Sequence, residues 1–214
     1  LSTPRAAAPA RQQGLRADGE RSWVLDAWQL ASAEEIADAD GAALSRSSAV
    51  TGRGWHVATV PGTVLGTLVD RGVYPDPDHG LDNMAIPESL NRHDWWYRSE
   101  FDLPATLAGQ RLRLEFKGIN YAGEAWLNGR RVGQTRGAFE RGEFDVTDLL
   151  QPGRRNVLAV RVSPPPHPGL PHEQSIAGGV GENGGMQVID GPTFVASEGW
   201  DWIPAVRDRN TGLW

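Results

Sequence analysis

The sequence predicts an all-β protein, a jelly-roll-like antiparallel β-sandwich with long loops and one or two short helices. Short runs of alternating apolar and polar residues recur along the chain, and turn residues separate them. The 26 glycines and 15 prolines are spread through all 214 residues. This spacing is typical of short strands joined by turns and argues against a helical bundle. A chain of this length can bury a core without covalent cross-links.

The strand signal is clearest between residues 95 and 163. Five β-rich runs are found there, at residues 96–103, 111–116, 122–127, 144–149 and 156–162. The dipeptide Asn128-Gly129 predicts a hairpin that returns through residues 131–133, because both residues accept a positive φ. A further strand is expected to return near residues 193–196, after a glycine-rich loop at 178–191.

The N-terminal part is predicted to hold the irregular elements. Residues 1–22 are expected to be a disordered lead, either the remainder of a processed signal peptide or an arbitrary start of the sequence. The later segments are a first strand at 23–32, a loosely packed surface stretch at 33–48, an extended run at 55–60 and a short helix at 64–69. Gly72 is expected to end that helix.

Composition excludes several classes of function. The formal net charge is −6 and the basic residues form no run, so a nucleic-acid partner is not expected. No stretch is apolar enough for membrane insertion, and cysteine is absent. The five histidines show no metal-ligand spacing, and the loop GGVGENGG lacks the end of a phosphate-binding motif. We therefore expect no metal and no cofactor.

The most suggestive polar cluster is Trp200-Asp201-Trp202. An indole face packs on the apolar face of a pyranose, and a carboxylate accepts hydrogen bonds from sugar hydroxyls. The triplet therefore predicts a sugar-binding site. The structural alternative is that Asp201 ties down the glycine-rich loop by bonding backbone amides. The chemistry of the residues leaves both interpretations open.

Several linked motifs resemble the sugar-binding, galactose-binding-domain-like N-terminal domain of glycoside hydrolase family 2. They are YRSEFDLP (97–104), LRLEFKGINYAGEAWLNGRRVG (112–133), FDVTDLL (144–150) and NVLAVRV (156–162). Residues 60–83 and 199–214 are similar to the branch of β-mannosidases, mannosylglycoprotein endo-β-mannosidases and exo-β-D-glucosaminidases. The resemblance covers residues 23–214 as one domain that lacks its last strand.

The resemblance implies that Asp201 binds sugar hydroxyls of the substrate, with Trp200 and Trp202 beside it. Arg207 and Asn210, in the segment RDRNTG, are further substrate-binding candidates. The family cleaves glycosides with retention, using two glutamates on a (β/α)₈ barrel. No Asn-Glu dipeptide, the signature of the acid/base, occurs in this sequence. We therefore expect no catalytic residue in this chain, which alone should be inactive.

An immunoglobulin-like domain and the catalytic barrel are then expected downstream, with the barrel as a partner of this domain. The implied function is cleavage of β-mannosidic linkages in N-glycans or mannan oligosaccharides, by a periplasmic or secreted enzyme. Two alternatives stay open. One is an exo-β-D-glucosaminidase of the same family, and the other is a stand-alone carbohydrate-binding module.

Overall fold

The larger layer of the protein is a six-stranded antiparallel sheet. The computed structural model describes residues 14–36, 40–49, 52–166 and 206–214. Within them the strand order of this sheet is β10-β9-β12-β6-β3-β4. The strands are β3 (Trp28–Ser32), β4 (His56–Ala58), β6 (Trp95–Asp102), β9 (Ala122–Leu127), β10 (Arg130–Arg136) and β12 (Arg155–Ser163). β6 pairs with β12 along its whole length and forms the centre of the sheet.

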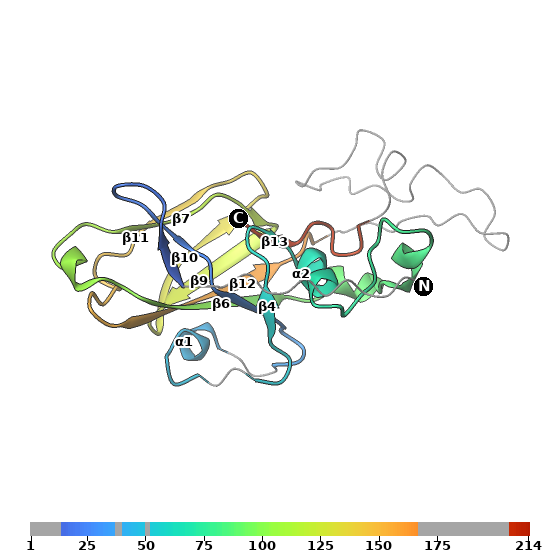
Figure 1. Cartoon of the computed structure of the whole chain (residues 1–214), viewed down its shortest axis with the longest axis horizontal. Coiled ribbons are helices and arrows are strands. Elements are labelled where there is room, and N and C mark those ends of the chain that lie inside the picture. Colours follow the sequence, from blue (N-terminus) through green and yellow to red (C-terminus); the bar gives the residue numbers. More distant parts are fainter. Residues whose placement is uncertain (1–13, 37–39, 50–51, 167–205) are drawn as a thin grey trace.

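Three small sheets make up the second layer. They are β7 (Arg113–Phe116) with β11 (Gly142–Asp145), β13 (Gly212–Leu213) between β5 (Gly62–Thr63) and β8 (Ile119–Asn120), and β1 (Leu15–Ala17) with β2 (Trp23–Leu25). Figure 1 shows β7, β11 and β13 on one side of the six-stranded sheet and the helix α1 on the other. The predicted antiparallel β-sandwich is confirmed.

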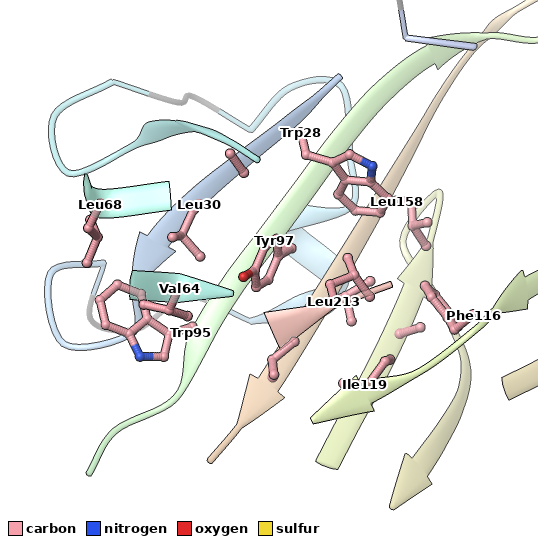
Figure 2. Packing of buried hydrophobic residues seen from close by; sticks show 14 of the residues in the cluster. Trp28, Leu30, Val64, Leu68, Trp95, Tyr97, Phe116, Ile119, Leu158 and Leu213 are labelled. Atoms are coloured by element: carbon pink, nitrogen blue, oxygen red, sulfur yellow. The ribbon is translucent and has the colours of Figure 1, made fainter. Parts of the chain in front are cut away.

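Alternation along the strands divides their side chains between the core and the outer face. Trp95 and Tyr97 of β6 and Leu158 of β12 point into the core, which they share with Phe116 and Leu213 of the second layer (Figure 2). All five are buried. Burial of a side chain of this size contributes about 1.5–3 kcal/mol, so this shared core holds the two layers together.

The outer face of the six-stranded sheet is covered by residues 40–49. The helix α1 (Gly41–Leu44) begins at Asp40, whose carboxylate accepts a hydrogen bond from Ala42 N–H. The buried guanidinium of Arg98 donates to the carbonyl oxygens of Leu44 (2.8 Å) and Arg46 (3.1 Å). The expectation of a loosely packed stretch at 33–48 is therefore wrong, because an arginine of the sheet binds the carbonyls at the end of α1.

The start of the described chain also differs from expectation. Residues 15–17 form β1, within the segment expected to be a disordered lead (1–22). The expected strand at 23–32 is divided at Asp26, whose carboxylate accepts a hydrogen bond from Gly14 N–H at 2.9 Å. Asp26 N–H in turn donates to the carbonyl of Gly14. These two hydrogen bonds hold the open end of the β1–β2 hairpin together. No local pattern in the sequence indicated this hairpin.

Other local expectations are confirmed. Asn128 (φ 52°) and Gly129 (φ 84°) both have positive φ in the hairpin between β9 and β10. The helix α2 (Val64–Asp70) is capped by Thr63, and Gly72 follows it at φ 71°. The remaining helical turns are η1 (Asp82–Ala85), η2 (Glu88–Asn91) and η3 (Ala105–Leu107).

The strand expected at 144–149 instead ends at Asp145. Its carboxylate accepts hydrogen bonds from the N–H (3.1 Å) and the hydroxyl (2.6 Å) of Thr147, which turns the chain. The strand expected near residues 193–196 lies outside the described residues.

Candidate functional site

The structure describes two of the five predicted substrate-binding residues. Arg207 and Asn210 lie in the turn of residues 206–211, called here the C-terminal turn. Trp200, Asp201 and Trp202 lie outside the described residues. The described part of the site is therefore the C-terminal turn and the side chains that hold it.

The backbone of the C-terminal turn is fixed from both sides. Arg209 and Asn210 are both left-handed, with φ of 52° and 56°. The side-chain amide of Asn120 donates to both of their carbonyl oxygens, at 2.9 Å and 2.8 Å. Asn210 N–H donates to the carboxylate of Asp208 at 2.9 Å. Asn tolerates the left-handed region better than most residues, so this fit accounts for an asparagine at position 210.

One carboxylate on η2 binds both arginines of the turn. Glu88 accepts from Arg207 at 2.7 Å through Oε1 and from Arg209 at 2.8 Å through Oε2. The side-chain amide of Asn91 donates to Glu88 Oε2 (3.0 Å) and to the carbonyl of Arg207 (2.8 Å). These four residues are called here the Glu88 clasp. Burial by itself raises the pKa of Glu88, but the hydrogen bonds of the clasp and the charge of Arg209 outweigh it and hold the pKa below its ordinary value.

Asp208 joins the same turn to α2. The side chain is fully buried, and its Oδ2 accepts from Leu65 N–H at 2.6 Å. Burial raises the pKa of Asp208, although the hydrogen bonds from Leu65 N–H and the hydroxyl of Thr63 act in the opposite direction. Burial also raises the pKa of Tyr97, and the charge of Asp208 adds to this effect. The turn thus has a carboxylate bonded to α2 and two guanidiniums bonded to η2.

These contacts hold the C-terminal turn against α2 and η2. The Arg207 side chain is 5 % exposed and is engaged by Glu88, so the structure places it in an internal ion pair and away from open solvent. Sequence reasoning missed Glu88 and Asn91, which lie more than a hundred residues away in the chain. The only local indication that these residues form ion pairs was the alternation of charges in the segment RDRN.

The described residues offer neither a metal centre nor a membrane-spanning helix. No group of three or more His, Asp or Glu side chains among them could hold a metal ion. No helix in that part of the chain is long and apolar enough to cross a membrane.

The curated proteins with similar sequences include two mannosidases and a glucosaminidase. A mannosylglycoprotein endo-β-mannosidase of Lilium longiflorum is 37% identical over 198 residues, 89% of this chain and 20% of that protein. An exo-β-D-glucosaminidase of Streptomyces avermitilis is 28% identical over 96% of this chain and 20% of its own length. A β-mannosidase of Bos taurus is 29% identical over 73% of this chain and 18% of its own length. The chain thus spans about a fifth of the length of these relatives.

Solved structures show the same fold. A β-D-mannosidase of Dictyoglomus thermophilum superposes with a TM-score of 0.57 at 28% identity, covering 87% of this chain and 20% of the other. An exo-chitosanase of Amycolatopsis orientalis, in complex with a nitrophenyl glucosaminide, gives 0.64 at 22% identity over 87% of this chain and 19% of its own. The family model described as the glycosyl hydrolase 2 galactose-binding domain-like domain matches residues 28–214. This chain therefore belongs to the galactose-binding-like domains of glycoside hydrolase family 2.

Proposed function

We propose that this chain is the N-terminal domain, residues 23–214, of a retaining hydrolase that cleaves β-mannosidic linkages in N-glycans or mannan oligosaccharides. In this proposal an immunoglobulin-like domain and a catalytic barrel follow it in the same polypeptide. The domain supplies Asp201, Trp200 and Trp202 to the substrate pocket of the barrel. The observation that carries the proposal is the C-terminal turn, which hydrogen bonds hold to α2, β8 and η2 and which immediately follows the segment with the Trp-Asp-Trp triplet.

The C-terminal turn supports this role through chain connectivity. Asp201 lies five residues before Val206, and an extended chain spans at most about 3.3–3.6 Å per residue. One end of this short segment is held by Asp208 and the Glu88 clasp. A sugar-binding carboxylate so close to a fixed turn loses less conformational entropy when it binds, which favours affinity.

In this proposal the acid/base and the nucleophile belong to the barrel. Retaining hydrolysis needs two carboxyl groups about 5–5.5 Å apart, one as acid/base and one as nucleophile. The proposed task of Asp201 is to accept hydrogen bonds from sugar hydroxyls. The proposed task of Trp200 is to stack on the apolar face of the ring. Arg207 and Asn210 are then proposed to act on substrate indirectly, by holding the segment that carries Asp201.

A second candidate function is exo-β-D-glucosaminidase activity. The similarity to the Streptomyces avermitilis enzyme, over 96% of this chain, favours it. Such a pocket needs an acidic partner for the amino group of glucosamine. The third candidate function is that of a stand-alone carbohydrate-binding module. Such a protein would have no catalytic barrel after residue 214.

Activity of the full-length protein decides among these functions. The proposal predicts hydrolysis of nitrophenyl β-mannoside with retention of configuration, and far lower kcat/KM on the matched β-glucosaminide and β-galactoside. Preference for the glucosaminide would favour the second function and contradict the first. A gene that encodes no barrel with an Asn-Glu motif beyond Trp214 would leave only the binding module.

We also place the protein in the periplasm or outside the cell. Support comes from the proposed function, because family members that degrade external glycans are exported. Cell fractionation with a cytosolic marker enzyme tests this location. Recovery of the protein with the cytosolic marker would contradict it.

A further inference from the structure

The helical turn η1 holds Met84 at the surface of the protein. Asp82, two residues before it, is buried, and Ile86, two residues after it, packs in the main core. Met84 N–H donates to the carbonyl of Leu81 at 3.0 Å. The backbone is therefore fixed on both sides of Met84, while Met84 itself is 53 % exposed. A thioether in this position is open to reagents in solution.

Met84 also contacts the C-terminal turn. Arg207 Nη2 donates to Met84 Sδ at 4.0 Å. The same guanidinium donates through Nη1 to Glu88 at 2.7 Å, so the thioether lies beside the Glu88 clasp. The sulfur of a thioether is a weak acceptor, whereas a guanidinium keeps its charge throughout the physiological pH range. The contact therefore joins a strong, buried donor to a weak, exposed acceptor.

Oxidation of the thioether exchanges this weak acceptor for a strong one. Hydrogen peroxide transfers one oxygen atom to the sulfur: the O–O bond breaks, an S–O bond forms, the sulfur loses two electrons and the peroxide is reduced to water. The 4.0 Å between Met84 Sδ and Arg207 Nη2 leaves room for that oxygen at hydrogen-bond distance from the nitrogen, about 2.7–3.2 Å. Methionine has three rotatable bonds, so the side chain can turn the oxygen toward the guanidinium.

We propose that Met84 is a modification site, at which hydrogen peroxide forms a sulfoxide whose oxygen accepts a hydrogen bond from Arg207 and holds the C-terminal turn more firmly on η1. The exposure of the sulfur gives the oxidant access, and the buried guanidinium responds to the new acceptor. Oxidation of a methionine inside a core disrupts packing, but Met84 lies outside the core and its oxygen meets a cation. The inference goes beyond the proposed function and involves no glycan.

Peptide mapping and hydrogen exchange in the full-length protein test this site. After treatment with hydrogen peroxide, Met84 should be oxidised at no less than about a tenth of the rate of free methionine. The amides of Arg209 and Thr211 donate to the carbonyls of Val206 and Asp208 within the turn. Their exchange should slow about tenfold on oxidation, because one added hydrogen bond from a charged donor shifts a local opening equilibrium by about that factor.

Two variants serve as controls. Met84→Leu removes the thioether and reports the effect of oxidation elsewhere in the protein. Leu81→Met combined with Met84→Leu moves a thioether three residues along η1, to a position that is 81 % exposed. The relocated thioether should be oxidised, yet neither variant should show slower exchange in the turn after treatment with peroxide.

Reduction of the oxidised protein by a methionine sulfoxide reductase should restore the original exchange rates. Three results would each overturn the inference: protection of Met84 from peroxide in the full-length protein, unchanged or faster exchange in the turn after its oxidation, or the same slowing in either variant. Protection would show that another part of the protein covers Met84. None of these measurements uses glycosidase activity, so failure of this inference and failure of the proposed function are distinguishable.

Discussion

Asp201 carries the sharpest functional prediction at the scale of a single residue. In the full-length enzyme, Asp201→Ala should lower kcat/KM about 10- to 150-fold, because a hydrogen bond to a charged acceptor contributes roughly 1.5–3 kcal/mol. Steady-state kinetics on nitrophenyl β-mannoside measures the loss. Trp200→Ala should chiefly raise KM, through lost stacking on the sugar ring.

The control for Asp201 is Asp190→Ala, which removes a carboxylate from the glycine-rich loop at 178–191, because most carboxylates in loops are solvated. It should leave kcat/KM within twofold of the wild-type value. The thermal midpoint of each variant separates the two interpretations of Asp201. A large fall in the midpoint of Asp201→Ala, with normal activity per folded molecule, would assign Asp201 a structural role.

Gly41 offers a stability prediction with a matched control. A Cβ at Gly41 would lie 2.3 Å from the indole of Trp126, whereas a Cβ at Gly66 would find its nearest neighbour at 3.4 Å. Gly41→Ala should therefore destabilise the protein by about 1–3 kcal/mol, through overpacking. Gly66→Ala, in the exposed part of α2, should be neutral or stabilising by up to about 1 kcal/mol. Urea unfolding of the two variants measures both; equal effects would contradict the close approach of α1 to the sheet at Trp126.

At the scale of elements, the Glu88 clasp joins η2 to the C-terminal turn. Glu88→Gln removes the charge that both Arg207 and Arg209 face, and should cost about 1–3 kcal/mol near neutral pH. Glu143→Gln is the control, since its ion pair with Arg113 is largely exposed and should contribute less than about 1 kcal/mol. Unfolding free energies of the full-length variants, measured by denaturant titration, test the difference.

The pH dependence of this difference follows from the lowered pKa of Glu88. A carboxyl whose pKa is lower in the folded state stabilises the fold at pH values above its unfolded pKa. That contribution is lost as the pH falls through the folded pKa. The gap between wild type and Glu88→Gln should therefore be largest near neutral pH and shrink below about pH 4. Asp208, whose pKa is raised, is common to both proteins and cancels in the comparison. A gap that does not change with pH would contradict the assignment.

The whole-molecule prediction is that this 214-residue chain, alone, hydrolyses no glycoside. A binding domain without the paired glutamates supplies neither the nucleophile nor the proton transfer. Nitrophenyl glycosides incubated with the purified chain should show no release above the buffer rate. The prediction fails if turnover survives purification and disappears on substitution of a carboxylate within the chain. A full-length protein with normal mannosidase activity is the positive control.

Much of the fold could be predicted because its signals are local. The alternation of β6 and β12, the hairpin at Asn128-Gly129 and the capped helix α2 each depend on residues close in sequence. The end of β11 at Asp145 was also local, through the hydrogen bonds of Thr147, yet the run at 144–149 was expected to form a longer strand. Family membership followed from the order of such local motifs, and the match over residues 28–214 confirms it.

The sequence by itself determined the sandwich, its family and a C-terminal segment rich in candidate sugar-binding residues. Only the tertiary structure decided what Arg207 and Arg209 do, because their partner Glu88 lies 119 and 121 residues away. It also decided that Arg98 binds the end of α1, at separations of 54 and 52 residues. Periodicity reports which face of an element is buried, but a buried charge takes its partner from whichever segment the fold brings beside it. The partner of a buried charge therefore cannot be predicted from a local pattern of residues.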